Sequence, residues 1–114
     1  MKKNKLYDEV YLDHIMDYIL VVEDIIKTGK KDRITELATI RAIEVIGEAA
    51  NNLSESLKTQ NREVPWRDII GMRNSLIHGY FEVDIDEIWD TCENDIPVLK
   101  EQIIRIKKEL QSSD

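Results

Sequence analysis

The chain has 114 residues, of which 42% are hydrophobic and 34% charged, and its net charge is -7 at neutral pH. These proportions predict a single folded domain with a solvated surface, and they exclude a disordered chain. The acidic balance argues against a protein that coats nucleic acid, because such binding depends on neutralising phosphates. It suits a partner with a basic face.

The sequence has no feature typical of export or membrane insertion. No apolar run approaches the ~18 residues that a membrane span needs. The basic N-terminus is not followed by the uninterrupted apolar stretch of a signal peptide. Cys92 is the single cysteine, so no internal disulfide can form. We therefore expect a cytoplasmic protein without membrane contact, in which Cys92 is a buried core thiol.

The first apolar pattern predicts a helix over Leu6–Lys27 that ends at Gly29. His14 borders its main apolar row, where we expect a packing or surface role. The main row and a second row on another face are formed by Tyr7, Tyr11, Ile15, Tyr18, Val22 and Ile25, and by Leu12, Met16 and Leu20.

A second helix is predicted over Arg33–Leu53, with Asp32 as its N-cap. Two apolar rows on each of two helices exceed what one compact core needs, so the surplus predicts self-association. The rows on this helix are Ile34, Ala38, Ala42, Val45, Ala49 and Leu53, and Ile40, Ile43, Gly47 and Ala50.

The rest of the chain predicts a loop and two more helices. The polar stretch 54–64 is interpreted as a loop, and a short third helix follows over Pro65–Ile77. A capping pattern at Asp84 begins the last helix. Its apolar row keeps its phase through Pro97, which predicts one long helix that is locally kinked at this proline. That row is Ile85, Ile88, Trp89, Cys92, Ile96, Leu99, Ile103, Ile106 and Leu110.

The predicted fold class is therefore all-α. We expect an antiparallel four-helix bundle in one domain over residues 1–114, with a frayed tail at 111–114. Trp66 and Trp89 are expected to anchor its core or an interface.

The third helix carries one anomaly, because Arg73 falls by helical phase on its apolar face with Trp66, Ile69, Ile70 and Ile77. A charge on the core side is costly unless it is paired with a carboxylate or lines a cleft. Asn74 and His78 share a helical edge. The five-residue step from Arg73 to His78 turns about 140°, so the two side chains can flank one concave spot.

This set suits RNA cleavage without a metal ion. A histidine can move a proton near neutral pH, and a guanidinium can stabilise charge on a phosphate. The sequence has no Gly-rich phosphate loop, His-Glu-x-x-His run or cysteine cluster, so we expect no cofactor and no metal site. The spacing alone leaves a second interpretation open, in which Arg73 forms a structural ion pair and His78 is a surface residue.

The residues PWRDIIGMRNSLIHGYFEVDIDEIW resemble the HepT-like branch of the HEPN superfamily. The family signature Arg-Asn-x-Leu-x-His-x-Tyr is present as Arg73-Asn74-Ser75-Leu76-Ile77-His78-Gly79-Tyr80. The upstream run IGEAANNLS and the later DIPVLKEQI also look like this family. The resemblance covers nearly the whole chain.

The resemblance implies a HEPN-type helical bundle that pairs as a homodimer, with the two Arg-x-x-x-x-His motifs facing one cleft. It implies a metal-independent endoribonuclease, with Arg73 and His78 catalytic, that acts as the toxin of a toxin–antitoxin pair. In such pairs the antitoxin is a small nucleotidyltransferase that transfers AMP groups onto the motif tyrosine, here Tyr80. RNA is then the expected substrate, and no DNA partner is expected.

Two further expectations concern residues around the motif. Asn74 and Glu48 are expected to support the site, Glu48 by orienting Arg73 from the second helix. The net charge of -7 repels RNA phosphates, so RNA contacts must lie on a local basic rim. The candidates for this rim are Arg41, Lys58, Arg62 and Arg67. The competing hypotheses are a non-catalytic helical module that partners a nucleotidyltransferase and a purely structural helical dimer.

Overall fold

The computed structural model describes residues 2–79 and 83–112 and is built from helices throughout this part of the chain. The elements are α1 (Lys2–Thr28), α2 (Arg33–Asn52), α3 (Glu55–Gln60), α4 (Trp66–His78), α5 (Ile85–Asp90), the π-helical turn η2 (Thr91–Asp95) and α6 (Ile96–Ser112). The all-α prediction is confirmed. Gln111 and Ser112, predicted to fray, continue α6, and the last two residues lie outside the described part.

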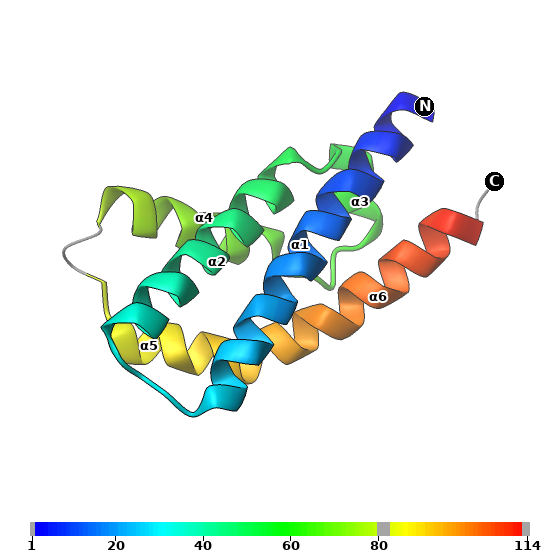
Figure 1. The fold of residues 1–114 in the computed structure, drawn as a ribbon. Helices are drawn as coiled ribbons and strands as arrows, with labels where there is room; N and C mark the ends of the chain where they lie inside the picture. The colour runs from blue at the N-terminus through cyan, green and yellow to red at the C-terminus, as the bar shows by residue number, and fades with distance from the viewer. Residues whose placement is uncertain (1, 80–82, 113–114) are drawn as a thin grey trace.

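The bundle is elongated, 45 × 28 × 21 Å, with α1 and α2 as its centre. Figure 1 shows α1 and α2 running antiparallel, with α6 along the other side of α1 and α4 against α2. The two chain ends lie at one end of the long axis, and the last turn of α4 lies at the other. None of the described helices has both the length and the apolar character needed to cross a bilayer.

The helices begin and end at the capping residues and the glycine that the sequence predicts. Gly29 follows α1 with φ +68°, a conformation that glycine adopts without strain. The Asp32 carboxylate accepts a hydrogen bond from the backbone N–H of Thr35 at 2.8 Å, and the Thr35 hydroxyl closes a capping box. Asp84 caps α5 through the backbone N–H groups of Asp86 and Glu87.

The predicted loop over 54–64 is wrong in its first half, because residues 55–60 form α3. Ser54 caps this helix by accepting from the Leu57 N–H at 3.2 Å. The Asp8 carboxylate of α1, buried to 4% exposure, accepts from the Ser54 N–H at 2.8 Å and from its hydroxyl at 2.7 Å. A bond from a residue 46 positions away thus holds the start of α3, and a six-residue helix is too short to show periodicity.

The last helix is continuous from Ile85 to Ser112, as predicted, but its irregularity precedes Pro97. Proline has no N–H to donate, and its ring displaces the carbonyl group four residues earlier, here that of Glu93. The chain accommodates this through the π-helical turn η2, which spans Thr91–Asp95. Figure 1 shows the segment changing direction where η2 meets α6.

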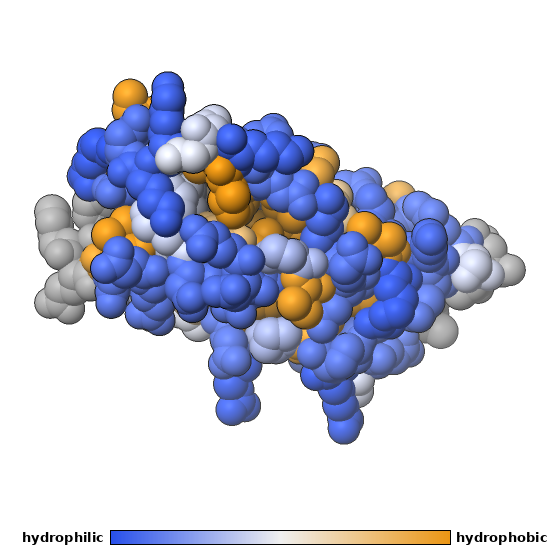
Figure 2. Space-filling view, turned by 90° about the horizontal axis from the view of Figure 1, so that it is seen from below, coloured by the Kyte–Doolittle hydropathy of each residue, from blue (hydrophilic) through white to orange (hydrophobic). Residues whose placement is uncertain are grey.

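The core confirms the row predicted for the last helix and most of both rows predicted for α2, but it differs at positions of α1 and at the start of α2. Ile19 replaces the predicted Tyr18 and Leu20 as a fully buried residue of α1. On α2, Ile34 is 78% exposed although it begins the predicted main row. Helices with apolar residues on two faces do not reveal from sequence which face meets the core. Figure 2 shows apolar side chains reaching the surface between hydrophilic ones on the lower face.

Candidate active site

The site is built where α4 crosses α2 at Gly47. A Cβ atom on Gly47 would overlap the Arg73 Cβ and lie 3.1 Å from the Ile69 carbonyl oxygen. Glycine therefore permits a backbone approach that any other residue would push apart. Because Glu48 is the next residue on α2, this contact also places its carboxylate beside Arg73.

Arg73 is held by two oxygen partners. Its guanidinium forms an ion pair with the Glu48 carboxylate, and its Nη1 donates to the Asn74 side-chain oxygen at 2.7 Å. The side chain is 26% exposed, and its buried Nε–H finds no acceptor among the described residues. The helical phase of Arg73 had predicted either a carboxylate partner or a cleft, and Glu48 is that partner.

His78 lies exposed in the last turn of α4, which ends at Gly79 through a 2.7 Å bond from the Gly79 N–H to the Ser75 carbonyl. It borders an open depression of about 910 Å³ whose walls include Arg67 and Glu87. Arg73 is not among the residues lining this depression. Within the described residues, one copy of the chain thus joins Arg73, Asn74 and Glu48, while the depression beside His78 is not lined by Arg73.

Ile77 lies on the same helix between these groups. It was predicted on the apolar core face of α4, yet it is 45% exposed, and Leu76 takes the buried position. Arg73 packs against Gly47 of α2, whereas Ile77, one turn further along the same face of α4, is left exposed. Tyr80 lies outside the described residues.

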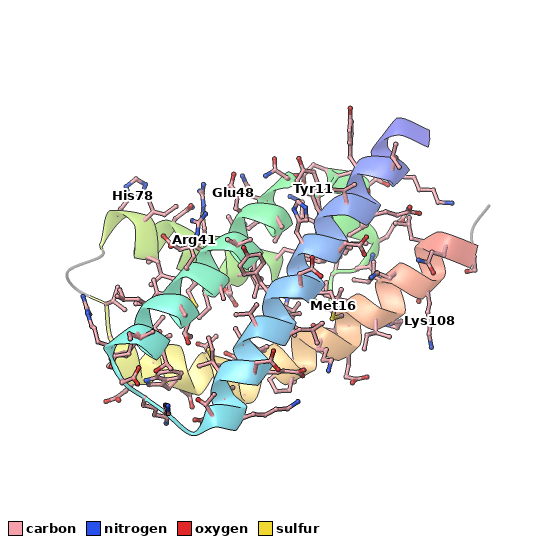
Figure 3. The ribbon with its side chains drawn as sticks, viewed as in Figure 1. Tyr11, Met16, Arg41, Glu48, His78 and Lys108 are labelled. Atoms are coloured by element: carbon pink, nitrogen blue, oxygen red, sulfur yellow. The ribbon has the colours of Figure 1, made fainter. Side chains whose placement is uncertain are left out.

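The three arginines and one lysine proposed for the rim are not equivalent. Figure 3 shows Arg41 and Glu48 of α2 and His78 of α4 projecting from the same side of the molecule. The Arg41 side chain is 72% exposed, and Arg67 shares the depression with His78. Lys58 is only 12% exposed and pairs with Glu55 on α3. Arg62 is exposed in the turn between α3 and α4.

The remaining singled-out residues have structural surroundings. Cys92 is fully buried, and this burial, with a smaller contribution from the Glu93 charge, raises its pKa to about 12. Trp66 is buried and donates from Nε1 to the Asn61 carbonyl at 3.0 Å. Trp89 is buried beneath Lys31, and His14 is exposed with its ring edge-on to Tyr11.

Sequence reasoning missed the role of Gly47 and the anchoring carboxylate of Asp8. Gly47 stood in a row of small residues, a pattern that indicates close helix approach without naming the partner. Asp8 gave no signal, because its partner Ser54 is far away in the chain. No group of three or more His, Cys, Asp or Glu side chains suited to a metal ion occurs within 2–79 and 83–112.

Residues 9–106 match the model of a family described as "Ribonuclease HepT-like". The chain belongs to the HepT-like ribonuclease family. The match contains the whole signature Arg73–Tyr80, and it also includes Gly47 and Glu48.

Curated relatives of this HepT-like chain carry ribonuclease names. A protein of Thermococcus cleftensis named "Probable ribonuclease HepT" is 38% identical over 86% of this chain and 94% of its own length. A "Putative RNase" of Caldanaerobacter subterraneus is 37% identical over 84% of this chain and 90% of its own.

A longer relative comes from Methanocaldococcus jannaschii and is named "Gamma-glutamylcyclotransferase and putative RNase". It is 36% identical over 92% of this chain, which spans half the length of that protein. No solved structure matches the chain.

Proposed function

We propose that this HepT-like protein is a metal-independent endoribonuclease in which Arg73 and His78 are catalytic. The observation that carries the proposal is the state of Arg73, a core-phase arginine held by Glu48 and Asn74, whose buried Nε–H has no acceptor among the described residues. An unpaired buried donor costs about 1–3 kcal/mol, which a purely structural ion pair has no reason to bear. The names of the relatives support the same class of reaction.

The chemistry uses the RNA's own 2′-hydroxyl as the nucleophile. The imidazole of His78 takes the 2′ proton, the 2′-oxygen forms a bond to phosphorus, and the bond to the 5′-oxygen breaks. The leaving oxygen receives a proton from an imidazolium or from water, which leaves a 2′,3′-cyclic phosphate and a 5′-hydroxyl end. The Arg73 guanidinium offsets the charge that builds on the phosphate oxygens.

The site is proposed to be completed by a second copy of the chain. In a single copy the depression that His78 lines does not include Arg73 among its described walls, and Ile77 between them is exposed. Pairing of two copies along this side of α2 and α4 would cover Ile77 and bring two motifs to one cleft. RNA phosphates would then meet Arg41, which projects from the same side as His78, and Arg67, which shares the depression with His78.

As the resemblance implies, the activity is proposed to be that of a toxin restrained by a nucleotidyltransferase antitoxin. Transfer of AMP to the Tyr80 hydroxyl forms a phosphodiester bond and releases pyrophosphate from ATP. The added nucleotide is bulky and anionic, so it would fill the cleft and repel RNA phosphate.

Purified protein tests the ribonuclease proposal. The chain expressed alone should cleave RNA in the presence of EDTA and leave cyclic phosphate ends, and Arg73→Ala and His78→Ala should each abolish cleavage. A strict metal requirement or 3′-hydroxyl ends would refute the mechanism. Control by AMP transfer is tested by the intact mass of the chain expressed with and without the nucleotidyltransferase. With that enzyme the mass should increase in AMP-sized steps, peptide mapping should locate them at Tyr80, and Tyr80→Phe should abolish them.

The alternative, a non-catalytic module that partners a nucleotidyltransferase, makes a different prediction. It requires a stable complex with that enzyme that survives His78→Ala, without RNA cleavage by the unmodified chain. The exposed position of His78 is compatible with both functions, so the cleavage assay decides between them.

A further inference from the structure

A second cavity, of about 290 Å³, lies on the far side of the α2–α4 contact from the Glu48 carboxylate, between α2, α4 and the η2–α6 segment. Its floor is apolar and almost fully buried, formed by Ile43, Ile46, Ile96 and Leu99. The mouth is formed by exposed residues, among them Val98, which is 58% exposed. The cavity is therefore open to a ligand and has an apolar interior for an aliphatic stem.

Two charged groups and one amide oxygen of this cavity favour a hydrogen-bond donor with positive charge. The Asp68 and Asp95 carboxylates, from α4 and η2, stand at its mouth, and no lysine or arginine is among its lining residues. Gln102 donates from Nε2 to the Glu63 carbonyl at 3.3 Å, which leaves its buried Oε1 without a partner in the described structure. A buried acceptor without a partner is destabilising, and a donor from a ligand would relieve that cost once the Gln102 amide turns its oxygen toward the cavity.

We propose that this cavity binds an arginine side chain presented by a protein partner. The aliphatic stem would cover the Ile and Leu floor, and the planar guanidinium has five N–H donors for the two carboxylates and the Gln102 oxygen. Lysine offers three donors at a single point and holds its water more strongly, so arginine fits better. The net charge of -7 attracts a basic partner in the first place.

The proposal does not depend on RNA cleavage, but it places the partner next to the candidate active site. Ile69 and Met72 of α4 wall the cavity, and Met72 directly precedes Arg73 in the chain. The Ile69 carbonyl also lies against Gly47. A side chain bound in the cavity therefore contacts the same turn of α4 that carries Arg73.

The test uses two short peptides that differ only in charge, acetyl-Leu-Arg-Leu-amide and its counterpart with neutral, isosteric citrulline. Binding is followed by the methyl NMR signals of isoleucine and methionine in the full chain. We expect saturable shifts at Ile46, Ile69, Met72 and Ile96 with the arginine peptide, and binding at least about tenfold weaker with citrulline, the effect of losing about 1.4 kcal/mol.

Matched variants locate the charge effect. Asp68→Asn combined with Asp95→Asn should remove the preference for arginine, whereas Asp86→Asn combined with Asp90→Asn, exposed carboxylates of α5 outside the cavity, should leave it unchanged. Gln102→Leu should weaken binding of the arginine peptide without unfolding the chain, because it removes an unpaired acceptor and keeps the volume.

Four outcomes would overturn the proposal. Equal binding of both peptides would mean a merely apolar cavity, and shifts centred elsewhere would mean a different site. Butylguanidinium binding as tightly as the arginine peptide would indicate a small-molecule site. Loss of a dimer in sedimentation when the peptide binds would show that a second copy of this chain fills the cavity.

Discussion

Arg73 carries a positive charge although its side chain lies partly inside the bundle, where a charge without a partner is costly. The Glu48 carboxylate pairs with this charge, and Gly47 leaves room for the aliphatic stem of Arg73. Removing one partner of a partly buried pair leaves the other charge uncompensated. We therefore propose that Glu48 positions Arg73 without contact to the reacting atoms.

If Glu48 orients Arg73, Glu48→Gln should lower kcat for RNA cleavage about tenfold, corresponding to about 1.4 kcal/mol of transition-state stabilisation. KM should change little, because removing an acidic side chain does not weaken attraction to phosphate. Glu44→Gln is the control, since Glu44 lies one turn earlier on α2 and pairs with Arg41. Equal effects of both variants would mean that Glu48 contributes only surface charge.

Cys92 gives a prediction for stability against pH. The folded chain keeps the thiol protonated up to a pKa of about 12, whereas the unfolded chain releases the proton near its ordinary value of 9.0. Between these values the unfolded state binds fewer protons, so the contribution of Cys92 to the free energy of unfolding should be constant below about pH 9 and fall as pH rises above it. Urea unfolding at pH 8, 10 and 11 measures this slope, which should be shallower in Cys92→Ala.

At the scale of helices, the α2–α4 crossing is the contact on which the site depends. Gly47→Ala should destabilise the protein by about 1–3 kcal/mol, because a methyl group there must push α4 away. It should also reduce cleavage more than Glu48→Gln does, since Arg73 moves with α4. Urea unfolding and cleavage assays at a temperature where the variant is folded separate the two effects.

Gly71 provides the matched control on α4. A Cβ atom there would meet nothing within 4 Å, so Gly71→Ala should stabilise the helix by about 0.5–1 kcal/mol through lost chain entropy. A destabilised Gly71→Ala, or a neutral Gly47→Ala, would contradict the packing described for α4. Both variants are compared by the midpoint of urea unfolding.

The long helices could be predicted from sequence because each has three or more turns of apolar periodicity and a polar cap. The six residues of α3 have neither enough turns nor a local signal, since the Asp8 carboxylate that holds Ser54 comes from α1. The Arg73 anomaly was visible from helical phase alone. The identity of its partner depended on how α2 and α4 cross, and the arginine-binding cavity depended on three segments meeting.

At the scale of the whole molecule, the apolar surface exceeds what the core uses. The large exposed hydrophobic residues are Leu6, Tyr7, Val10, Leu20, Val21, Ile26, Ile34, Leu37, Ile77 and Val98. Among them Ile77 is the one on the motif helix. Six of these residues lie on α1, so the proposed pairing at the α2–α4 side rests on Ile77 alone, an exposed isoleucine beside the candidate site that would gain from being covered.

Sedimentation tests this pairing. The wild-type chain should behave as a dimer of the 13.3 kDa protomer, and Ile77→Asp should shift it to monomer, because the interface would bury an unpaired charge. Leu6→Asp, at the opposite end of the long axis, is the control and should remain dimeric. A dimeric Ile77→Asp, or a monomeric Leu6→Asp, would place the interface elsewhere.

The position of the chain ends determines where a fused domain or an attached tag lies relative to the motif. Both ends leave the bundle at one end of its long axis, away from the last turn of α4. A second domain, an affinity tag or a tether to a solid support attached at either terminus would therefore stand clear of the motif. The same fold can be joined to longer polypeptides, or immobilised on a sensor surface, while the last turn of α4 stays accessible.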